Sequence, residues 1–413
     1  MILINSKNFI FILSILMVAF ISNPYSFGHA NHGQEIPPIL SLIDQDLYLN
    51  DFAIQSYLDI NPRYFWQLLI AGMHHFFGIS IPASLMIIQV ASALSFFCAI
   101  FCITQLLSRE GSRKSNNNFQ AFFMPAYVSL LAMLPLLSWG SKIFYLEAIP
   151  STLGMGIAIW SFYFALKSQW FFAYTLCGVS IFFHFLVGLF AGLVIFPFFV
   201  LHFLRHISVN KSLICMFFWL APAFYIYFNM LLLETESIYQ YEFFEVFGLF
   251  RVPHHWVPSS ASIFRWISDL FLLFSGLFCF LKLLQTNFSR DILFFLLTII
   301  VVSLIGLTLN YLFVEVYRSE FIGSLQFQRI IPFGHLAVFF LISLYLVNVP
   351  RNSVSEKLQA LSIFSFPLLT VIIVNYRTPI EPILALISIL IIIALTFIFY
   401  SCFHIGKSSG ITG

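Results

Sequence analysis

Runs of about 20 consecutive apolar residues recur along the whole sequence, and they constrain the fold more than any other feature. Each run is long enough to cross the hydrocarbon core of a bilayer as an α-helix. The chain is 60% hydrophobic and only 9% charged, whereas a soluble domain carries about 25% charged residues. Lipid offers no hydrogen bonds to an open backbone, and the runs are continuous rather than alternating. The sequence therefore predicts spanning helices and not a barrel.

The expected fold is an all-α polytopic membrane protein with about 12 membrane-spanning helices. Residues 1–413 are expected to form a single integral membrane domain without a separate soluble domain. An apolar link joins 170–185 to 187–204, so a bent or re-entrant hairpin is an alternative for that pair. The expected spans are 8–23, 81–107, 120–138, 149–166, 170–185, 187–204, 212–232, 265–284, 291–313, 330–349, 359–375 and 382–402.

Lysine and arginine in the short loops favour a cytoplasmic N-terminus, because positive charge is enriched in cytoplasmic loops. This orientation leaves most acidic residues outside, together with two long loops at about 24–80 and about 233–264. We expect a protein of a bacterial inner (plasma) membrane, with membrane lipids as partners. The net charge of +2 does not indicate a nucleic-acid partner, and none is expected. Alternatively, residues 1–29 form a signal peptide. The first long loop would face outward in that case too.

The first outer loop contains the stretch LIDQDLYLND at 42–51, which concentrates acidic residues in a chain poor in charge. Asp44 and Asp51 would share one face of a helix, whereas Asp44 and Asp46 would share one face of an extended segment. Clustered carboxylates raise one another's pKa, and a divalent cation such as Mg²⁺ or Mn²⁺ would stabilise them. A single carboxylate there would also serve as a general base for a hydroxyl group. The alternative is that these acids solvate the loop or cap a helix that begins near Leu47.

The second outer loop contains FRVPHHWVPSS at 250–260, which combines cationic and hydrogen-bonding side chains. The planar guanidinium of Arg251 suits phosphate oxygens, and His254 and His255 can protonate or donate hydrogen bonds. These three residues form the predicted phosphate site. The alternative is that Arg251 pairs with a nearby glutamate while both histidines lie at the level of the lipid headgroups.

Three further features bear on the interior and on the interface. The stretch 64–79, YFWQLLIAGMHHFFGI, predicts an interfacial helix. His184 lies within or between apolar runs, and ionisable groups inside membranes are functional candidates. Arg329 opens a span, and it either snorkels to the headgroups or contacts a phosphate. Gly188 and Gly192 form a GxxxG pattern, which is typical of close helix packing.

An acidic pair just after the first span, followed by interfacial helices in a polytopic protein, resembles the GT-C class of membrane glycosyltransferases. The D-x-D of Asp44, Gln45 and Asp46 carries the resemblance, together with the architecture of most of the chain. The resemblance implies transfer of a sugar from a polyprenyl-phosphate donor to a hydroxyl acceptor at the outer face. It also implies that Asp44 and Asp46 act as catalytic base or metal ligands.

Two other functions remain open at this point. One is a transporter or flippase of lipid-linked sugars, for which ionisable groups near the membrane midplane are typical. The expected spans are almost free of charge, with Asp269 and Glu315 near their ends, which argues against ion-coupled transport. The other is a non-catalytic membrane assembly protein, in which the outer-loop acids can be neutralised without effect.

Overall fold

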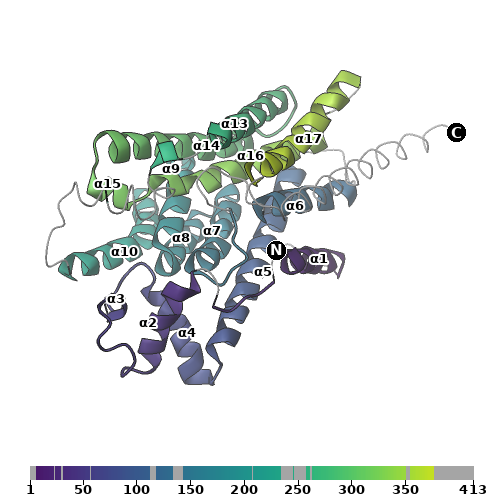
Figure 1. Ribbon diagram of the computed structural model, residues 1–413. Coiled ribbons are helices and arrows are strands. Elements are labelled where there is room, and N and C mark those ends of the chain that lie inside the picture. The colour runs from purple at the N-terminus through teal and green to yellow at the C-terminus, as the bar shows by residue number, and fades with distance from the viewer. Residues whose placement is uncertain are drawn as a thin grey trace.

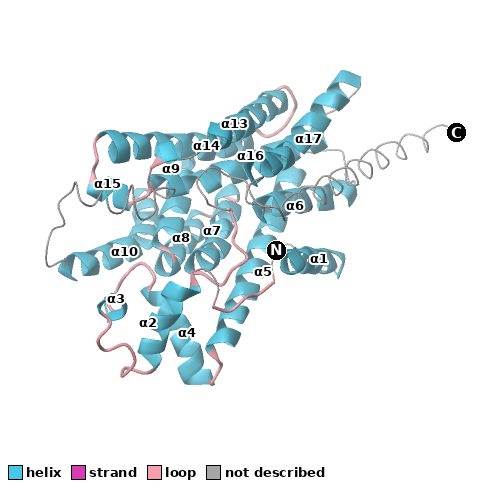
Figure 2. Ribbon diagram, viewed as in Figure 1, coloured by secondary structure: helices cyan, strands magenta, loops and turns pink. Residues whose placement is uncertain are grey.

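The computed structural model describes residues 6–22, 24–28, 31–55, 57–111, 118–133, 143–206, 208–233, 245, 257–260, 263–349 and 354–375. Every regular element in these ranges is a helix, and no strand occurs among them (Figure 2). The prediction of an all-α fold is therefore confirmed for this part of the chain. The expected span 382–402 and most of the second outer loop lie outside the described residues.

The helices follow one another along the whole described chain (Figure 1). Their bounds are α1 Ser6–Ser22, α2 His32–Ile43, α3 Phe52–Gln55, α4 Tyr64–Phe77, α5 Ile81–Gly111, α6 Asn118–Met133, α7 Pro150–Leu166, α8 Trp170–Phe183, α9 Phe185–His206, α10 Val209–Leu233, η2 Pro258–Ser260, α13 Ile263–Leu284, α14 Arg290–Asn310, η3 Tyr311–Val316, α15 Glu320–Ser324, η4 Phe327–Ile330, α16 Ile331–Asn348 and α17 Val354–Asn375.

Five helical segments among the described residues are long and apolar enough to cross a membrane, which is consistent with an integral membrane protein. A count of about 12 spans is not confirmed. Several expected spans form shorter apolar helices, and α8 has 14 residues. At about 1.5 Å per residue, such a helix is shorter than the hydrocarbon core of about 30 Å. The five long segments are Ile81–Arg109, Phe185–Leu204, Val209–Leu232, Arg290–Val316 and Phe321–Asn348.

The junction between α8 and α9 is a sharp break at His184. The backbone of His184 is extended, with φ −150° and ψ 103°, and α9 begins at the next residue. The two helices pack against each other along their lengths. A bent hairpin, the alternative that the sequence left open for this pair, therefore describes the fold here.

The hydrophobic core has a large part and a small part. The large part fills the bundle around α16, which is buried along most of its length. The small part includes Ile39, Trp66, Ile70 and Leu85, which join α2 and α4 to the start of α5. The small core holds α2 against α4 at one end of the bundle, where Figure 1 shows the two helices side by side. This packing positions the polar residues described below.

The glycines of the GxxxG pattern allow close helix packing, as the sequence predicted. A Cβ atom on Gly192 would overlap the indole ring of Trp219 on α10. A Cβ atom on Gly188 would overlap backbone atoms of Cys177 and Ile181 on α8. Because backbone atoms in a packed helix cannot move aside cheaply, Gly188 is the more restrictive position.

We expect Gly188→Ala to lower the free energy of unfolding by about 2 kcal/mol or more, because the new methyl group meets backbone atoms of α8. Thermal unfolding of the protein in detergent measures this effect. Gly72→Ala is the matched control, since only the Phe76 ring lies near a Cβ there, at 3.8 Å. An equal, small effect of both substitutions would contradict the packing described for α8 and α9.

Candidate functional site

The two acids of the D-x-D lie on an exposed turn. Asp44 follows the last residue of α2, and its Oδ1 accepts a hydrogen bond of 3.1 Å from the backbone N–H of Asp46. Both side chains are exposed. Asp46 and Asp51 border a shallow surface hollow together with Tyr48, whose φ of 63° is left-handed. The structure thus gives Asp44 a local role in the turn, and it leaves both carboxylates open to solvent.

The predicted phosphate site of the second loop cannot be placed. Arg251, His254 and His255 lie outside the described residues. The loop's far end is described, and there the backbone N–H of Ser259 donates a hydrogen bond of 2.7 Å to Glu315 Oε1. This contact attaches residues 257–260 to the π-helical turn η3 that follows α14.

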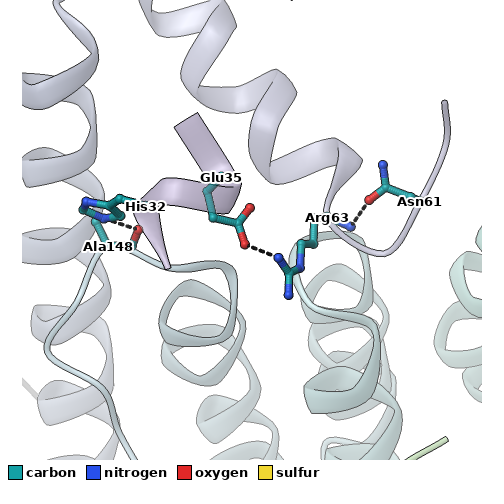
Figure 3. Close-up of polar contacts among 5 residues, drawn as sticks. All are labelled: His32, Glu35, Asn61, Arg63 and Ala148. Carbon is teal, nitrogen blue, oxygen red and sulfur yellow. Dashed lines mark hydrogen bonds and ion pairs between the residues drawn. The ribbon is translucent and has the colours of Figure 1, made fainter. Parts of the chain in front are cut away.

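A buried ion pair between Glu35 and Arg63 lies at the packing of α2 on α4. Arg63 precedes the first residue of α4, and its Nη1 lies 2.6 Å from Glu35 Oε1 (Figure 3). The Glu35 side chain is 2% exposed, whereas that of Arg63 is 38% exposed. A hydrogen bond of 2.8 Å from the Arg63 backbone N–H to Asn61 Oδ1 fixes the turn that presents the arginine. The sequence pattern did not predict this pair.

The carboxyl group of Glu35 is only half satisfied. Its Oε2 is buried and has no hydrogen-bond partner among the described residues. Burial raises the pKa of Glu35 above its ordinary value, and the charge of Arg63 opposes that rise only in part. A buried carboxyl group with a raised pKa and one free oxygen is typical of a group that exchanges a proton.

His32 fixes α2 to the segment that precedes α7. Its Nε2 lies 3.3 Å from the carbonyl oxygen of Ala148 (Figure 3). Its Nδ1 accepts a hydrogen bond of 3.1 Å from the backbone N–H of Gly28. The imidazole is 3% exposed. His32 therefore connects three parts of the chain around Glu35, and we assign it a positioning role.

One further cationic side chain and one histidine lie near Arg63 of the ion pair. Arg63 and Arg329 are both within electrostatic range of His184, at the break between α8 and α9. Arg329, on η4, is also within electrostatic range of Arg63 and of the hydroxyl group of Tyr145. Arg63 thus connects Glu35 to Arg329 and His184 in one group of ionisable side chains. Its permanent charge is positive by one unit, which favours an anionic ligand.

Several buried polar atoms in these elements have no hydrogen-bond partner among the described residues. They include both amide atoms of Gln67, which follows Arg63 by one turn of α4, and Nε of Arg329. Oε1 of Gln326 is a third case, on a residue whose φ of 45° is left-handed. Unpaired buried polar atoms cost free energy and are rare, so they favour a site that a polar ligand completes.

We expect Arg63→Ala to destabilise the fold by about 2 kcal/mol near neutral pH, because it leaves the buried carboxylate of Glu35 unpaired. Partial exposure of Arg63 screens the pair and limits the effect. Burial already raises the pKa of Glu35, and loss of Arg63 raises it further. The folded protein then binds a proton more tightly than the unfolded chain does. Stability is thus retained at low pH and lost as the pH rises through the folded pKa.

Thermal unfolding of wild type and Arg63→Ala across a range of pH measures this dependence. The double variant Arg63→Ala, Glu35→Gln is the control, because it has no carboxylate to desolvate. The double variant should lose less free energy of unfolding relative to Glu35→Gln than Arg63→Ala loses relative to wild type. This loss should not depend on pH in the range where Glu35 titrates. If the loss of unfolding free energy caused by Arg63→Ala stays constant as the pH falls, Arg63 does not stabilise the fold by pairing with the Glu35 carboxylate.

No protein-family model matches the chain, and comparison with curated proteins and with solved structures likewise finds no match. Within the residues that the structure describes, no group of three or more His, Cys, Asp or Glu side chains is arranged to hold a metal ion. The site must therefore be interpreted from its own geometry.

Proposed function

We propose that the protein is a membrane glycosyltransferase that moves a sugar from a polyprenyl-phosphate donor to a hydroxyl acceptor at the outer membrane face. The observation that carries this proposal is the half-satisfied carboxyl group of Glu35, which is paired with Arg63. Arg63 in turn lies within electrostatic range of Arg329 and His184. Transfer from a phosphate-linked sugar requires a base for the acceptor and cations for the leaving group. The resemblance of the chain to the GT-C class supports the same reaction.

Glu35 is the proposed general base. Oε1 is held by Arg63, so Oε2 is the oxygen free to take the proton of the acceptor hydroxyl. The acceptor oxygen then forms a bond to the anomeric carbon, and the bond from that carbon to the phosphate oxygen breaks. The proton ends on Glu35, and the electron pair leaves with the lipid phosphate. A raised pKa brings a carboxyl group closer to the operating pH, which makes it a better base.

Arg329 and Arg63 are proposed to stabilise the phosphate. A guanidinium group matches phosphate oxygens in a bidentate geometry, and Nε of Arg329 has no partner among the described residues. His184 lies within electrostatic range of both arginines. Its Nδ1 accepts a hydrogen bond of 3.2 Å from the backbone N–H of Val187, so Nε2 carries the proton and would donate to the same ligand. Arg251, His254 and His255 stay proposed as further phosphate contacts from the second loop.

The D-x-D retains a proposed role as a second acidic site. Asp44 and Asp46 are exposed on the turn after α2, where a divalent cation such as Mg²⁺ or Mn²⁺ could be held together with ligands from the donor or from water. Both carboxylates are open to solvent, whereas the carboxyl group of Glu35 is buried and has one oxygen without a hydrogen-bond partner among the described residues. We therefore assign the role of general base to Glu35. We assign metal binding, the other role considered for an acidic residue, to Asp44 and Asp46.

Native mass spectrometry of the protein extracted with its surrounding lipids tests the proposed function. The proposal predicts a retained polyprenyl phosphate or its glycoside, whose mass would also identify the sugar. Incubation with membranes that supply an acceptor should then release the sugar and leave the lipid phosphate. Retention of the glycoside without release would favour a flippase. Bulk phospholipid alone, even after addition of a polyprenyl-phosphate glycoside, would contradict both readings and favour an assembly protein.

A further inference from the structure

A second pair of ionisable side chains lies inside the helix bundle, away from the outer-face site. Nε2 of His335 on α16 is 3.6 Å from Oδ1 of Asp269 on α13, and the side chains are 2% and 9% exposed. His335 belongs to the candidate span Phe321–Asn348. Ionisable groups within membrane helices are costly, and they usually face a partner or a water-filled cavity and serve a function.

The pair borders a small cavity of about 70 Å³ at the junction of α13, α14 and α16. Most of its lining is aliphatic, and Ser303 adds a hydroxyl group from α14. A water molecule takes up about 30 Å³ in the liquid, so the cavity has room for one or two. A separation of 3.6 Å is longer than a direct hydrogen bond, so the two groups do not satisfy each other and water in the cavity can hydrogen-bond to either.

Polar atoms at the cavity have hydrogen-bonding capacity left over. Nδ1 of His335 is buried and has no hydrogen-bond partner among the described residues. The Ser303 hydroxyl donates to the carbonyl oxygens of Ile299, at 2.8 Å, and Ile330, at 3.3 Å. Its lone pairs remain available to accept from a water. A purely structural ion pair would not require an imidazole nitrogen left open beside a water-sized space.

Asp269 and His335 are the only ionisable groups among the described residues that line the cavity. Asp291 at the start of α14 and Glu356 and Lys357 on α17 are exposed. Arg329 on η4 precedes His335 by six residues and belongs to the outer-face site. The pair is thus the ionisable part of the cavity lining among the described residues.

We propose that Asp269 and His335 form an intramembrane proton-binding site, with water in the adjoining cavity as the carrier. The pair takes one proton from a hydronium ion and leaves a neutral water, so its charge rises by one unit. Release to water reverses the step. This inference goes beyond the proposed transferase activity and does not depend on it.

Solid-state NMR of the ¹⁵N-histidine-labelled protein in lipid bilayers tests the proposal. The His335 signals are identified by their absence from His335→Gln. In wild type, we expect them to change between the neutral and the protonated pattern as the pH is lowered within the range where the protein stays folded. In Asp269→Asn, we expect this change to be lost. Ser343→Ala is the control, since the buried Ser343 on α16 bonds only to Phe340 among the described residues, and the change should persist.

The wild-type measurement alone can overturn the proposal. A His335 that keeps a single protonation pattern across the whole pH range would identify a structural pair and no proton site. The same conclusion would follow if the change persisted fully in a folded Asp269→Asn. Where either variant fails to fold, infrared difference spectra of wild type decide the matter, because proton uptake at the pair must alter a carboxyl or an imidazole band reversibly with pH.

Discussion

Replacing Glu35 with Gln is expected to abolish most sugar transfer while leaving the fold intact. Glutamine has nearly the same shape, and its amide oxygen can still accept the hydrogen bond from Arg63. It cannot take a proton from an acceptor, so transfer should fall by about 10²–10⁴-fold, the usual contribution of a general base. Cells that lack the gene and carry the variant should accumulate the donor glycoside, which mass spectrometry of their lipids quantifies.

The matched control for this substitution is Asp59→Asn. Asp59 is an exposed acid between α3 and α4, and its neutralisation should leave donor levels as in wild type. Equal amounts of each variant in the membrane exclude a folding defect. Wild-type donor levels in cells that carry Glu35→Gln would show that Glu35 is not the base.

Replacing Arg329 with Met is expected to remove donor binding. Methionine keeps much of the length of the side chain but lacks the charge that makes the site positive. Hydrogen bonds to charged groups contribute about 1.5–3 kcal/mol, so retention of a polyprenyl-phosphate lipid should fall by about 10-fold to 150-fold. Native mass spectrometry of the purified protein, titrated with the lipid, measures this loss.

Two variants sharpen the Arg329 experiment. Arg329→Lys keeps the charge without the planar donor geometry and should restore binding only in part. Arg318→Met removes an exposed arginine from the turn between η3 and α15 and should leave binding unchanged. Equal losses for Arg318→Met and Arg329→Met would point to general attraction of an anionic lipid, and they would contradict a specific phosphate site at η4.

The sequence predicts the helices well because apolar runs and the lipid environment leave few alternatives. The helix at 64–77 and the close packing at Gly188 and Gly192 follow from the same reasoning. The sequence also predicts a break between 170–185 and 187–204, and the structure places it at His184. Hydropathy does not give the lengths of the separate helices, and several expected spans form helices shorter than the hydrocarbon core.

The candidate site was only partly predictable. Arg329 and His184 were considered from the sequence as ionisable groups in apolar surroundings, and the structure brings them close to each other. Glu35 and Arg63 are 28 positions apart, and their contact depends on the packing of α2 against α4. The spacing of the two acids in the D-x-D predicted a catalytic or metal-binding site. In the structure, α2 ends at Ile43 and both acids lie on an exposed turn. The sequence feature that could have indicated the site is Glu35 itself, a single acidic residue among the apolar residues of α2.

The most direct test compares Glu35 with the two acids on the turn after α2 in one assay. Cells that lack the gene are complemented with wild type, Glu35→Gln, Asp44→Asn or Asp46→Asn at equal membrane levels, and the donor glycoside is quantified. The account predicts accumulation with Glu35→Gln and clearly lower levels with Asp44→Asn and Asp46→Asn. Accumulation with Asp46→Asn, together with wild-type levels for Glu35→Gln, would contradict it and would place the chemistry on the exposed turn.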